Sequence, residues 1–390
     1  MLIATLGFIS ILGPFGSDSY LPALPIMAKD LHTNITGVQG VLASFTVGMA
    51  LGQLLMGSLS DALGRRLLII LGPLVMGIAG LIGGNASSLI VLLFSCALIG
   101  FSASTGMVVG RALISDLATG LTATRAFSLM GLFVGIGPIL GPLAGALVLQ
   151  VSNWRWVFFG LSLLALAIAL LAIIRVPESL PKAQRKPLNL RAMFASAGEI
   201  LGNRLFRQHA IILWCTATIM FAYISSSPFI TQQILGFTPL QYTYVFGVNG
   251  AGLMITGAIA SAMAKRTSPR RIVGWGVALQ LIAAGVLVST WIMGSPSAWN
   301  LLPAMFLMVS AMGFLFGPAT ALGLIQVRHH AGTALALQGS IQFLICGVSA
   351  TAVGLAGPTE FWPLALIVAL SSLISLGAWV RTKQSLAAAL

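Results

Sequence analysis

The chain has 390 residues, of which 58% are hydrophobic and only 7% are charged. Soluble domains carry roughly 25% charged residues, so this composition excludes a water-soluble globular protein and predicts one that is embedded in lipid. The formal net charge is +13, but the Lys and Arg residues stand in short clusters between long uncharged runs. That distribution is typical of membrane topology rather than of nucleic-acid binding.

The first predicted elements are spanning helices at residues 1–28 and 36–60. The opening segment has no basic region at its start and is longer than a cleaved signal peptide, so we expect it to remain as the first span. Residues 67–110 contain no Asp, Glu, Lys or Arg. Because a spanning helix needs about 20 apolar residues, this run holds two spans, which the turn-forming residues 83–88 divide.

The next predicted spans are residues 126–150 and 155–176, and the longest polar stretch, 177–208, follows them and begins PESLP. Beyond it, three nearly uncharged runs each hold two spans that are joined by a turn rich in Gly and Pro; they are residues 210–264, 272–327 and 331–380. The total is twelve spans. The tenth should bend or break, because it carries Pro303, Gly313, Gly317 and Pro318.

The polar stretch divides the spans six and six. We therefore expect an N-terminal six-helix bundle (1–176), a cytosolic linker (177–208) and a C-terminal six-helix bundle (209–390). Small residues recur at 100–106 and 313–319, which favours two related halves. The predicted fold class is an all-α polytopic membrane protein with twelve transmembrane helices in two six-helix pseudo-symmetric halves.

The loop charges predict the orientation of the chain in the membrane. If the N-terminus is cytosolic, nearly all loop cations fall on the cytosolic side, and only Lys29 and Arg155 fall outside. Cytosolic loops carry such an excess of Lys and Arg. Both termini are therefore predicted to lie in the cytosol.

The second span ends in residues 57–66, which read GSLSDALGRR. This pattern resembles the G-x-x-x-D-x-x-G-R-R signature of the major facilitator superfamily, whose members are two-half transporters that work by alternating access. The resemblance implies a conformational lock that includes an acidic residue at the inner end of helix four; its members here would be Gly57, Asp61, Gly64, Arg65, Arg66 and Asp116. A simpler interpretation is that these charges only anchor the loop in the cytosol.

Helix five carries Gly137, Gly141 and Gly145 at a spacing of four residues, and such a stripe lets another helix pack closely. Pro138 and Pro142 each remove a backbone donor and should bend the helix. The segment resembles the G-x-x-x-G-P-x-x-G-G antiporter motif, which implies export rather than uptake, although Pro142 stands where the motif has its second paired glycine. A plain packing face is the alternative interpretation.

Asp18 lies inside the first predicted span, where a carboxylate costs several kcal/mol and is functional by default. Residues 18–25 read DSYLPALP, which resembles the D-x-Y-L-P-A-L-P segment of the Bcr/CflA subfamily of 12-span drug:proton antiporters. Residues 153–155, NWR, fit the same subfamily. We therefore expect Asp18 to bind and release the coupled proton; in the alternative it lies in a solvated outer vestibule and titrates normally.

The sequence departs from the subfamily at the start of helix four. Many members carry an arginine there, to which a part in proton transfer is attributed, whereas residues 95–98 of this chain read SCAL. The nearest arginine, Arg111, is about four turns deeper. We expect either that it pairs with Asp116 or that it contacts substrate beneath a central cavity. The path of the proton is left open.

No carboxylate falls inside a span of the second half, so coupling is expected in the first half. Aromatic rings with a few polar groups suit a pocket for amphipathic ligands. The residues expected to line a substrate cavity are Tyr20, Gln53, Arg111, Trp214, Tyr223, Tyr244, Asn249 and Phe316. Most such aromatics, taken singly, are instead lipid-facing, interfacial or core residues.

We predict a proton-coupled multidrug efflux transporter of the inner membrane, which exports a small lipophilic or cationic compound while protons flow inward. No cofactor or metal is expected, because the proton gradient drives the exchange and the three cysteines are isolated in apolar runs. Nucleic acid is not expected as a partner, and the chain is expected to be a monomer. One alternative is a proton-coupled exporter of a metabolite such as a sugar, an amino acid or a siderophore precursor. Another is a channel or membrane sensor. No nucleophile elbow, phosphate loop or metal cluster indicates an enzyme.

Overall fold

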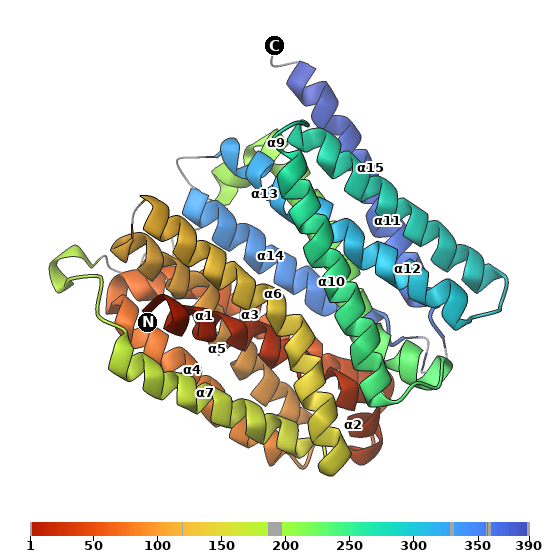
Figure 1. Cartoon of the computed structure of the whole chain (residues 1–390), viewed down its shortest axis with the longest axis horizontal. Helices are drawn as coiled ribbons and strands as arrows, with labels where there is room; N and C mark the ends of the chain where they lie inside the picture. The colour runs from red at the N-terminus through yellow and green to blue at the C-terminus, as the bar shows by residue number, and fades with distance from the viewer. Residues whose placement is uncertain are drawn as a thin grey trace. The chain divides into compact units, whose positions relative to one another are not determined.

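The computed structural model describes residues 2–118, 120–185, 197–327, 331–355, 357 and 360–387, and every regular element in these residues is helical (Figure 1). The chain divides into two compact units, Met1–Leu190 and Arg191–Leu390. This boundary falls within the expected linker, 177–208. The middle of that linker (186–196) and the expected inner-loop cation Arg328 lie outside the described residues.

Unit 1 contains six long helices and two short pieces that follow the first of them. The elements are α1 (Leu2–Asp18), η1 (Leu21–Ala23), α2 (Leu24–Asp30), α3 (Ile35–Leu63), α4 (Arg65–Gly84), α5 (Leu89–Leu117), α6 (Gly120–Val151) and α7 (Arg155–Arg175). A short turn of helix, η2 (Lys182–Gln184), follows α7.

Unit 2 repeats the six long elements with two interruptions. The elements are α9 (Arg204–Phe229), a π-helical turn (Ile230–Ile234), α10 (Pro239–Met263), α11 (Pro269–Ile292), α12 (Ala298–Ala311), η4 (Met312–Phe314), α13 (Phe316–Ile325), α14 (Ala331–Ala352) and α15 (Trp362–Ala387). The predicted break in the tenth span is confirmed, since α12 and α13 are joined by the 3₁₀ turn η4.

Eleven of the described helices are long and apolar enough to cross a membrane. They correspond to the second through twelfth predicted spans. The expected first span, residues 1–28, was wrong as one continuous helix: α1 ends at Asp18 after 17 residues, and a turn, η1 and α2 follow. Pro22 and Pro25 lack the N–H that a helix interior needs, so the chain restarts as short pieces at these positions.

The helices of the two units pack in the same order. In unit 1, α3 packs along α5, α4 lies on α5 and α7, and α1 lies on α6 and α5. In unit 2, α10 packs on α12, α11 lies on α12 and α15, and α9 lies on α15, α14 and α13; the contact of α9 with α15 is more extensive than the matching contact of α1 with α7. This correspondence, helix by helix, is the pseudo-symmetry that the division into six and six spans predicted.

Glycines allow the closest of these crossings. A Cβ at Gly48 of α3 would collide with the backbone carbonyl of Ala97, and one at Gly100 of α5 would collide with that of Phe45. Small residues let membrane helices approach until their backbones touch. The α3–α5 contact is therefore built on backbone rather than on large side chains.

Candidate functional site

The first cluster of interest lies where α3 ends and α4 begins, and we call it the inner cluster because the surrounding loops are expected to be cytosolic. The two helices are joined by Gly64 alone, whose φ is +105°. A residue with a side chain is strained at this φ, and a Cβ here would also collide with the side chains of Glu178 and Arg185. Gly64 therefore permits the turn that brings Asp61 and Arg65 together.

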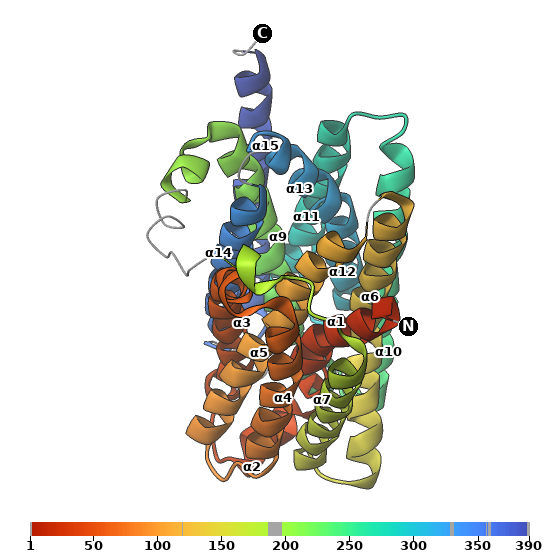
Figure 2. The same ribbon diagram turned by 90° about the vertical axis from the view of Figure 1, so that its left-hand side faces the viewer.

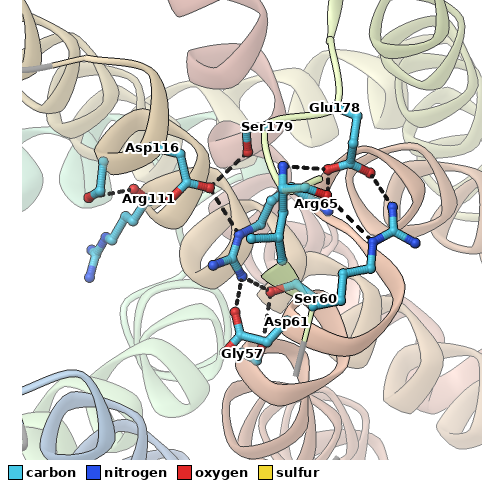
Figure 3. Close-up of polar contacts among 11 residues, drawn as sticks. Gly57, Ser60, Asp61, Arg65, Arg111, Asp116, Glu178 and Ser179 are labelled. Atoms are coloured by element: carbon cyan, nitrogen blue, oxygen red, sulfur yellow. Dashed lines mark hydrogen bonds and ion pairs between the residues drawn. The ribbon is translucent and has the colours of Figure 1, made fainter. Parts of the chain in front are cut away.

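Arg65 is the centre of the inner cluster (Figure 3). Its Nη1 lies 2.6 Å from Asp61 Oδ1, and its Nε donates to Asp116 Oδ2 at 3.2 Å. The guanidinium also donates to the hydroxyl of Ser60, whose own Oγ–H donates to the carbonyl of Gly57 at 2.8 Å. The Arg65 side chain is only 12% exposed. A planar guanidinium can hold two carboxylates at once, which a lysine ammonium does less well.

Two residues that the sequence analysis did not assign to this site complete it, and both come from the PESLP segment after α7. Glu178 Oε1 accepts from the backbone N–H of Arg65 at 2.9 Å, and Ser179 Oγ donates to Asp116 Oδ2 at 2.8 Å. No side chain caps α4 at Gly64, so Glu178 places a negative charge at an otherwise open helix N-terminus. An acidic residue directly after an apolar helix was the only signal that pointed to it.

The remaining arginines of the region are placed differently. Arg66 leaves the inner cluster and donates from Nη2 to the carbonyl of Ile173 at 3.0 Å, in the last turn of α7. Arg111, one expected partner of Asp116, points away from that carboxylate in Figure 3 and has no ion-pair partner in the described part of the chain. Asp116 is instead paired with Arg65.

Asp18 is the last residue of α1 and is only 2% exposed. The Oγ–H of Ser17 donates to its Oδ1 at 2.6 Å. The glycine stripe of α6 packs against this end of α1. A Cβ at Gly141 would lie 3.4 Å from the Asp18 Cβ, and one at Gly145 would collide with the carbonyl of Ser19. The predicted carboxylate and the predicted stripe thus lie against each other.

The remainder of the α6 motif lies farther along α1. A Cβ at Gly137 would collide with the ring of Pro14, 2.5 Å away. Pro138 and Pro142 lie inside α6, which runs on through both of them as a helix. The stripe therefore follows α1 from Pro14 to Ser19, with Asp18 within the contact.

The three substrate-cavity residues expected in unit 1 lie on different elements of that unit. Tyr20 is fully buried, and its ring stacks on Phe158 of α7 at a centroid distance of 5.5 Å. Gln53, 9% exposed, contacts the sulfur of Met107 at 3.9 Å through its Nε2. The third expected cavity residue of unit 1, Arg111, lies on α5 one helical turn after Met107.

In unit 2 the structure brings two of the five expected cavity residues together. Asn249 donates from Nδ2 to the hydroxyl of Tyr223 at 2.8 Å, and the Tyr223 ring stacks on Phe246 at 5.5 Å. Trp214 instead donates to the carbonyl of Gln338. The other two lie elsewhere: Phe316 packs against the core that includes Ile212 and Leu213, and Tyr244 is 61% exposed.

A second charged group lies at the opposite end of unit 1, and we call Asp30, Trp154 and Arg155 the outer cluster. Asp30 Oδ2 accepts from the indole Nε1 of Trp154 at 2.9 Å and from Arg155 Nη1 at 2.7 Å. The guanidinium lies over the Trp154 ring, 4.4 Å from its centroid, and also donates to the carbonyl of Ala86. The bonds from Trp154 and Arg155 lower the pKa of the Asp30 carboxyl below its usual value.

Eleven apolar helices of spanning length in the described residues, divided between two compact units, define a multi-pass membrane protein. Ion pairs lie at both ends of unit 1, and the carboxylate of Asp18 is buried at the end of α1. The sequence model of the Major Facilitator Superfamily matches residues 6–350. The chain therefore belongs to the Major Facilitator Superfamily, as its GSLSDALGRR segment indicated.

Relatives and solved structures agree with this assignment. The chain is 29% identical to the uncharacterized MFS-type transporter YdgK of Bacillus subtilis (strain 168), over 97% of this chain and 94% of that protein. It is 27% identical to multidrug resistance protein D of Escherichia coli (strain K12), over 97% and 95%. The crystal structure of a mutant of the nucleoside transporter NupG superposes with a TM-score of 0.77 at 12% identity, covering 98% of this chain and 100% of that one. At that identity the likeness concerns the fold alone.

Proposed function

We propose that this chain is a proton-coupled multidrug efflux transporter, a drug:proton antiporter of the Bcr/CflA type in the inner membrane, with both termini in the cytosol. The observation that carries the proposal is the burial of Asp18 against the glycine stripe of α6. The name of the relative in Escherichia coli, a multidrug resistance protein, supports a drug as substrate.

Asp18 performs the coupling in this proposal. An ionised carboxylate within a span costs several kcal/mol unless something compensates its charge. A proton or a bound drug can do so, and the two therefore compete for the site. Inward release of the proton admits the drug from the cytosolic side, and proton binding from the outer side expels it. No cofactor takes part, because the proton gradient supplies the free energy.

The inner cluster acts as the conformational lock. Arg65 joins the end of α3, through Asp61, to the end of α5, through Asp116. Glu178 and Ser179 add the segment after α7. Any movement that separates these helix ends must break bonds to Arg65. The cluster therefore favours the state in which it is intact, and transport requires that it open in each cycle.

The buried group of Tyr223, Asn249 and Phe246 is the part of unit 2 that we propose to contact the drug. It offers stacked aromatic faces and one amide–hydroxyl bond. Such a surface suits small lipophilic or cationic compounds, since rings contact both apolar groups and cations favourably. Export of a sugar, amino acid or siderophore precursor is the alternative. It predicts metabolite accumulation in a deletion strain and no change in drug susceptibility.

The proposal is tested with purified protein in liposomes that contain a pH-sensitive dye. Wild-type protein should release protons when drug is added and should exchange drug for protons across an imposed gradient. Asp18→Asn should bind drug but release no protons, because the amide has no proton to exchange. Glu360→Gln serves as the matched control, since this carboxylate is exposed and outside the spans. Exchange by Asp18→Asn at the wild-type rate would remove Asp18 from the mechanism.

A further inference from the structure

The segment from Asp18 to Asp30 is held at both ends by residues at the start of α7, where Trp154 is the N-cap residue and Phe158 lies in the first turn. Figure 2 shows α2 at the end of unit 1 where α7 starts. At its far end, Asp30 is bound by Trp154 and Arg155. At its near end, the Tyr20 ring stacks on Phe158, with 6° between the ring planes. Trp154 and Phe158 are four residues apart and therefore neighbours on α7.

The two attachment points are themselves in contact. The rings of Trp154 and Phe158 meet edge to face at a centroid distance of 5.9 Å. Trp154 and Phe158 are each 1% exposed, and Tyr20 is 0% exposed. A continuous row of packed groups therefore runs from Asp30 through Trp154 and Phe158 to Tyr20. Tyr20 in turn is two residues from Asp18 in the chain, across the turn at which α1 ends.

Asp18 depends on this row because α1 ends with it. The backbone N–H of Ser19 still donates to the carbonyl of Phe15, but the chain then turns. Asp18 therefore has no following turn of α1 packed beside its side chain. Its position is set on one side by the stripe of α6 and on the other by the buried piece that starts at Tyr20. Close-packed groups of this kind shift together rather than singly.

We infer that the outer cluster is a positioning device for Asp18. Asp30 and Arg155 hold Trp154, Trp154 packs on Phe158, and Phe158 holds Tyr20 and with it the end of α1. The inference rests on the proposed function, because it assigns a role relative to the proton carrier. The outer cluster touches neither proton nor drug, and it acts only through the placement of the carboxyl between α1 and α6.

A purely structural role would also explain a buried tryptophan, so the test needs matched substitutions. α7 carries a second aromatic pair, Trp156 and Phe159, whose rings meet edge to face at 5.5 Å. Trp156 is 56% exposed, and the ring of Phe159 lies over Gly84 of α4 instead of Tyr20. Phe158→Leu and Trp154→Phe are therefore compared with Phe159→Leu and Trp156→Phe, the same changes at nearby positions of the same helix.

Two rates are measured in liposomes, drug-induced proton release and drug–drug counterflow, which needs no change in the protonation of Asp18. We expect Phe158→Leu and Trp154→Phe to lower proton release by about two- to thirty-fold, the range of a 0.5–2 kcal/mol coupling between connected sites. Counterflow should stay near the wild-type rate. The two control variants should leave both rates unchanged. Asp30→Asn should give a smaller loss of proton release than these two variants. Asp30→Glu, which keeps the carboxylate, should release protons at nearly the wild-type rate.

Several outcomes overturn the inference. Equal losses of proton release in Phe158→Leu and Phe159→Leu would show a general effect of cavities in α7. Parallel losses of proton release and counterflow would show a structural role. If Phe158→Leu fails to fold, Asp30→Asn tests the inference instead, because Asp30 is exposed. A wild-type ratio of proton release to counterflow in Asp30→Asn contradicts the inference. Asp18→Asn in the same assay separates a failure of this inference from a failure of the proposed function. Wild-type proton release by Asp18→Asn would show that Asp18 is not the proton carrier.

Discussion

Asp30 shows how much of the site depends on single side-chain contacts. Its carboxylate accepts from an indole and a guanidinium on one oxygen, and its side chain is still 43% exposed. An exposed ion pair alone contributes little, so the buried Trp154 is the partner that makes this contact specific. Asp30 also pairs with Arg155, one of the two cations that the sequence analysis expected on the outer side of the membrane.

The lowered pKa of Asp30 predicts a pH dependence of stability. Hydrogen bonds from Trp154 and Arg155 favour its ionised form in the folded protein, so the unfolded chain binds more protons and stability rises with pH in this range. The contribution of Asp30 should be fully present above its unfolded pKa of about 3.9 and be lost as the pH falls through the lower folded value. Thermal unfolding in detergent at a series of pH values measures it.

The control for this prediction is Asp30→Asn, which keeps an acceptor for the indole but cannot be protonated. The difference in stability between wild type and variant should shrink toward zero as the medium is acidified below about pH 4. A constant difference over the whole range would mean that the charge of Asp30 does not stabilise the fold.

Glu178 and Ser179 show which residues a linear pattern hides. The GSLSDALGRR segment and Asp116 were identified from the family signature, and the structure brings Asp61, Arg65 and Asp116 together. Glu178 is separated by 113 positions from the N–H that it accepts from. No spacing rule connects them, because the contact depends on where the end of α7 lies beside the start of α4.

At the scale of elements, the contact between α1 and α6 decides where Asp18 lies. The stripe of Gly137, Gly141 and Gly145 was correctly read as a surface for close packing, but its partner could not be named from spacing. The structure identifies that partner as the stretch from Pro14 to Ser19. Other helix boundaries follow local signals, since capping boxes start α10 at Thr238 and α12 at Ser297.

Gly145→Ala is the element-scale prediction. The added Cβ would collide with the carbonyl of Ser19, so α1 and α6 must separate. Overpacking of this kind costs typically 1–3 kcal/mol, and we expect a lower unfolding temperature together with weaker proton release. Gly131→Ala on the same helix is the control, because nothing lies within 4 Å of a Cβ there. Equal stability of the two variants would show that the α1–α6 contact can relax.

At the scale of the whole molecule, the orientation in the membrane is a prediction from loop charge. It is tested by single cysteines in a variant that lacks Cys96, Cys215 and Cys346. Lys265→Cys, between α10 and α11, should react with a membrane-impermeant maleimide only after the cells are opened. Ser295→Cys, between α11 and α12, should react in intact cells. The reverse labelling pattern would show that the chain has the opposite orientation in the membrane, which contradicts the proposed direction of export.

The lock supplies a second prediction at this scale. Asp61→Asn removes one of the two carboxylates on Arg65 while the bond to Asp116 remains. We expect the variant to spend more time in the state with the cluster open, and hence to transport more slowly while remaining folded. Distances between spin labels on exposed loops, measured with and without drug, report the two states. A wild-type distribution of distances together with wild-type transport would show that the pair is only an anchor.

The sequence by itself determined the class of protein and the location of the second through twelfth spans, because long apolar runs are stable in lipid only as helices or closed barrels that satisfy their own backbone hydrogen bonds. It also determined the family, through motifs whose residues are close in the chain. Only the tertiary structure decided that α1 ends at Asp18, that the α6 stripe packs there, and that the row from Asp30 to Tyr20 leads toward it. These contacts join positions many residues apart, and local propensity and spacing carry no information about which distant surfaces will meet.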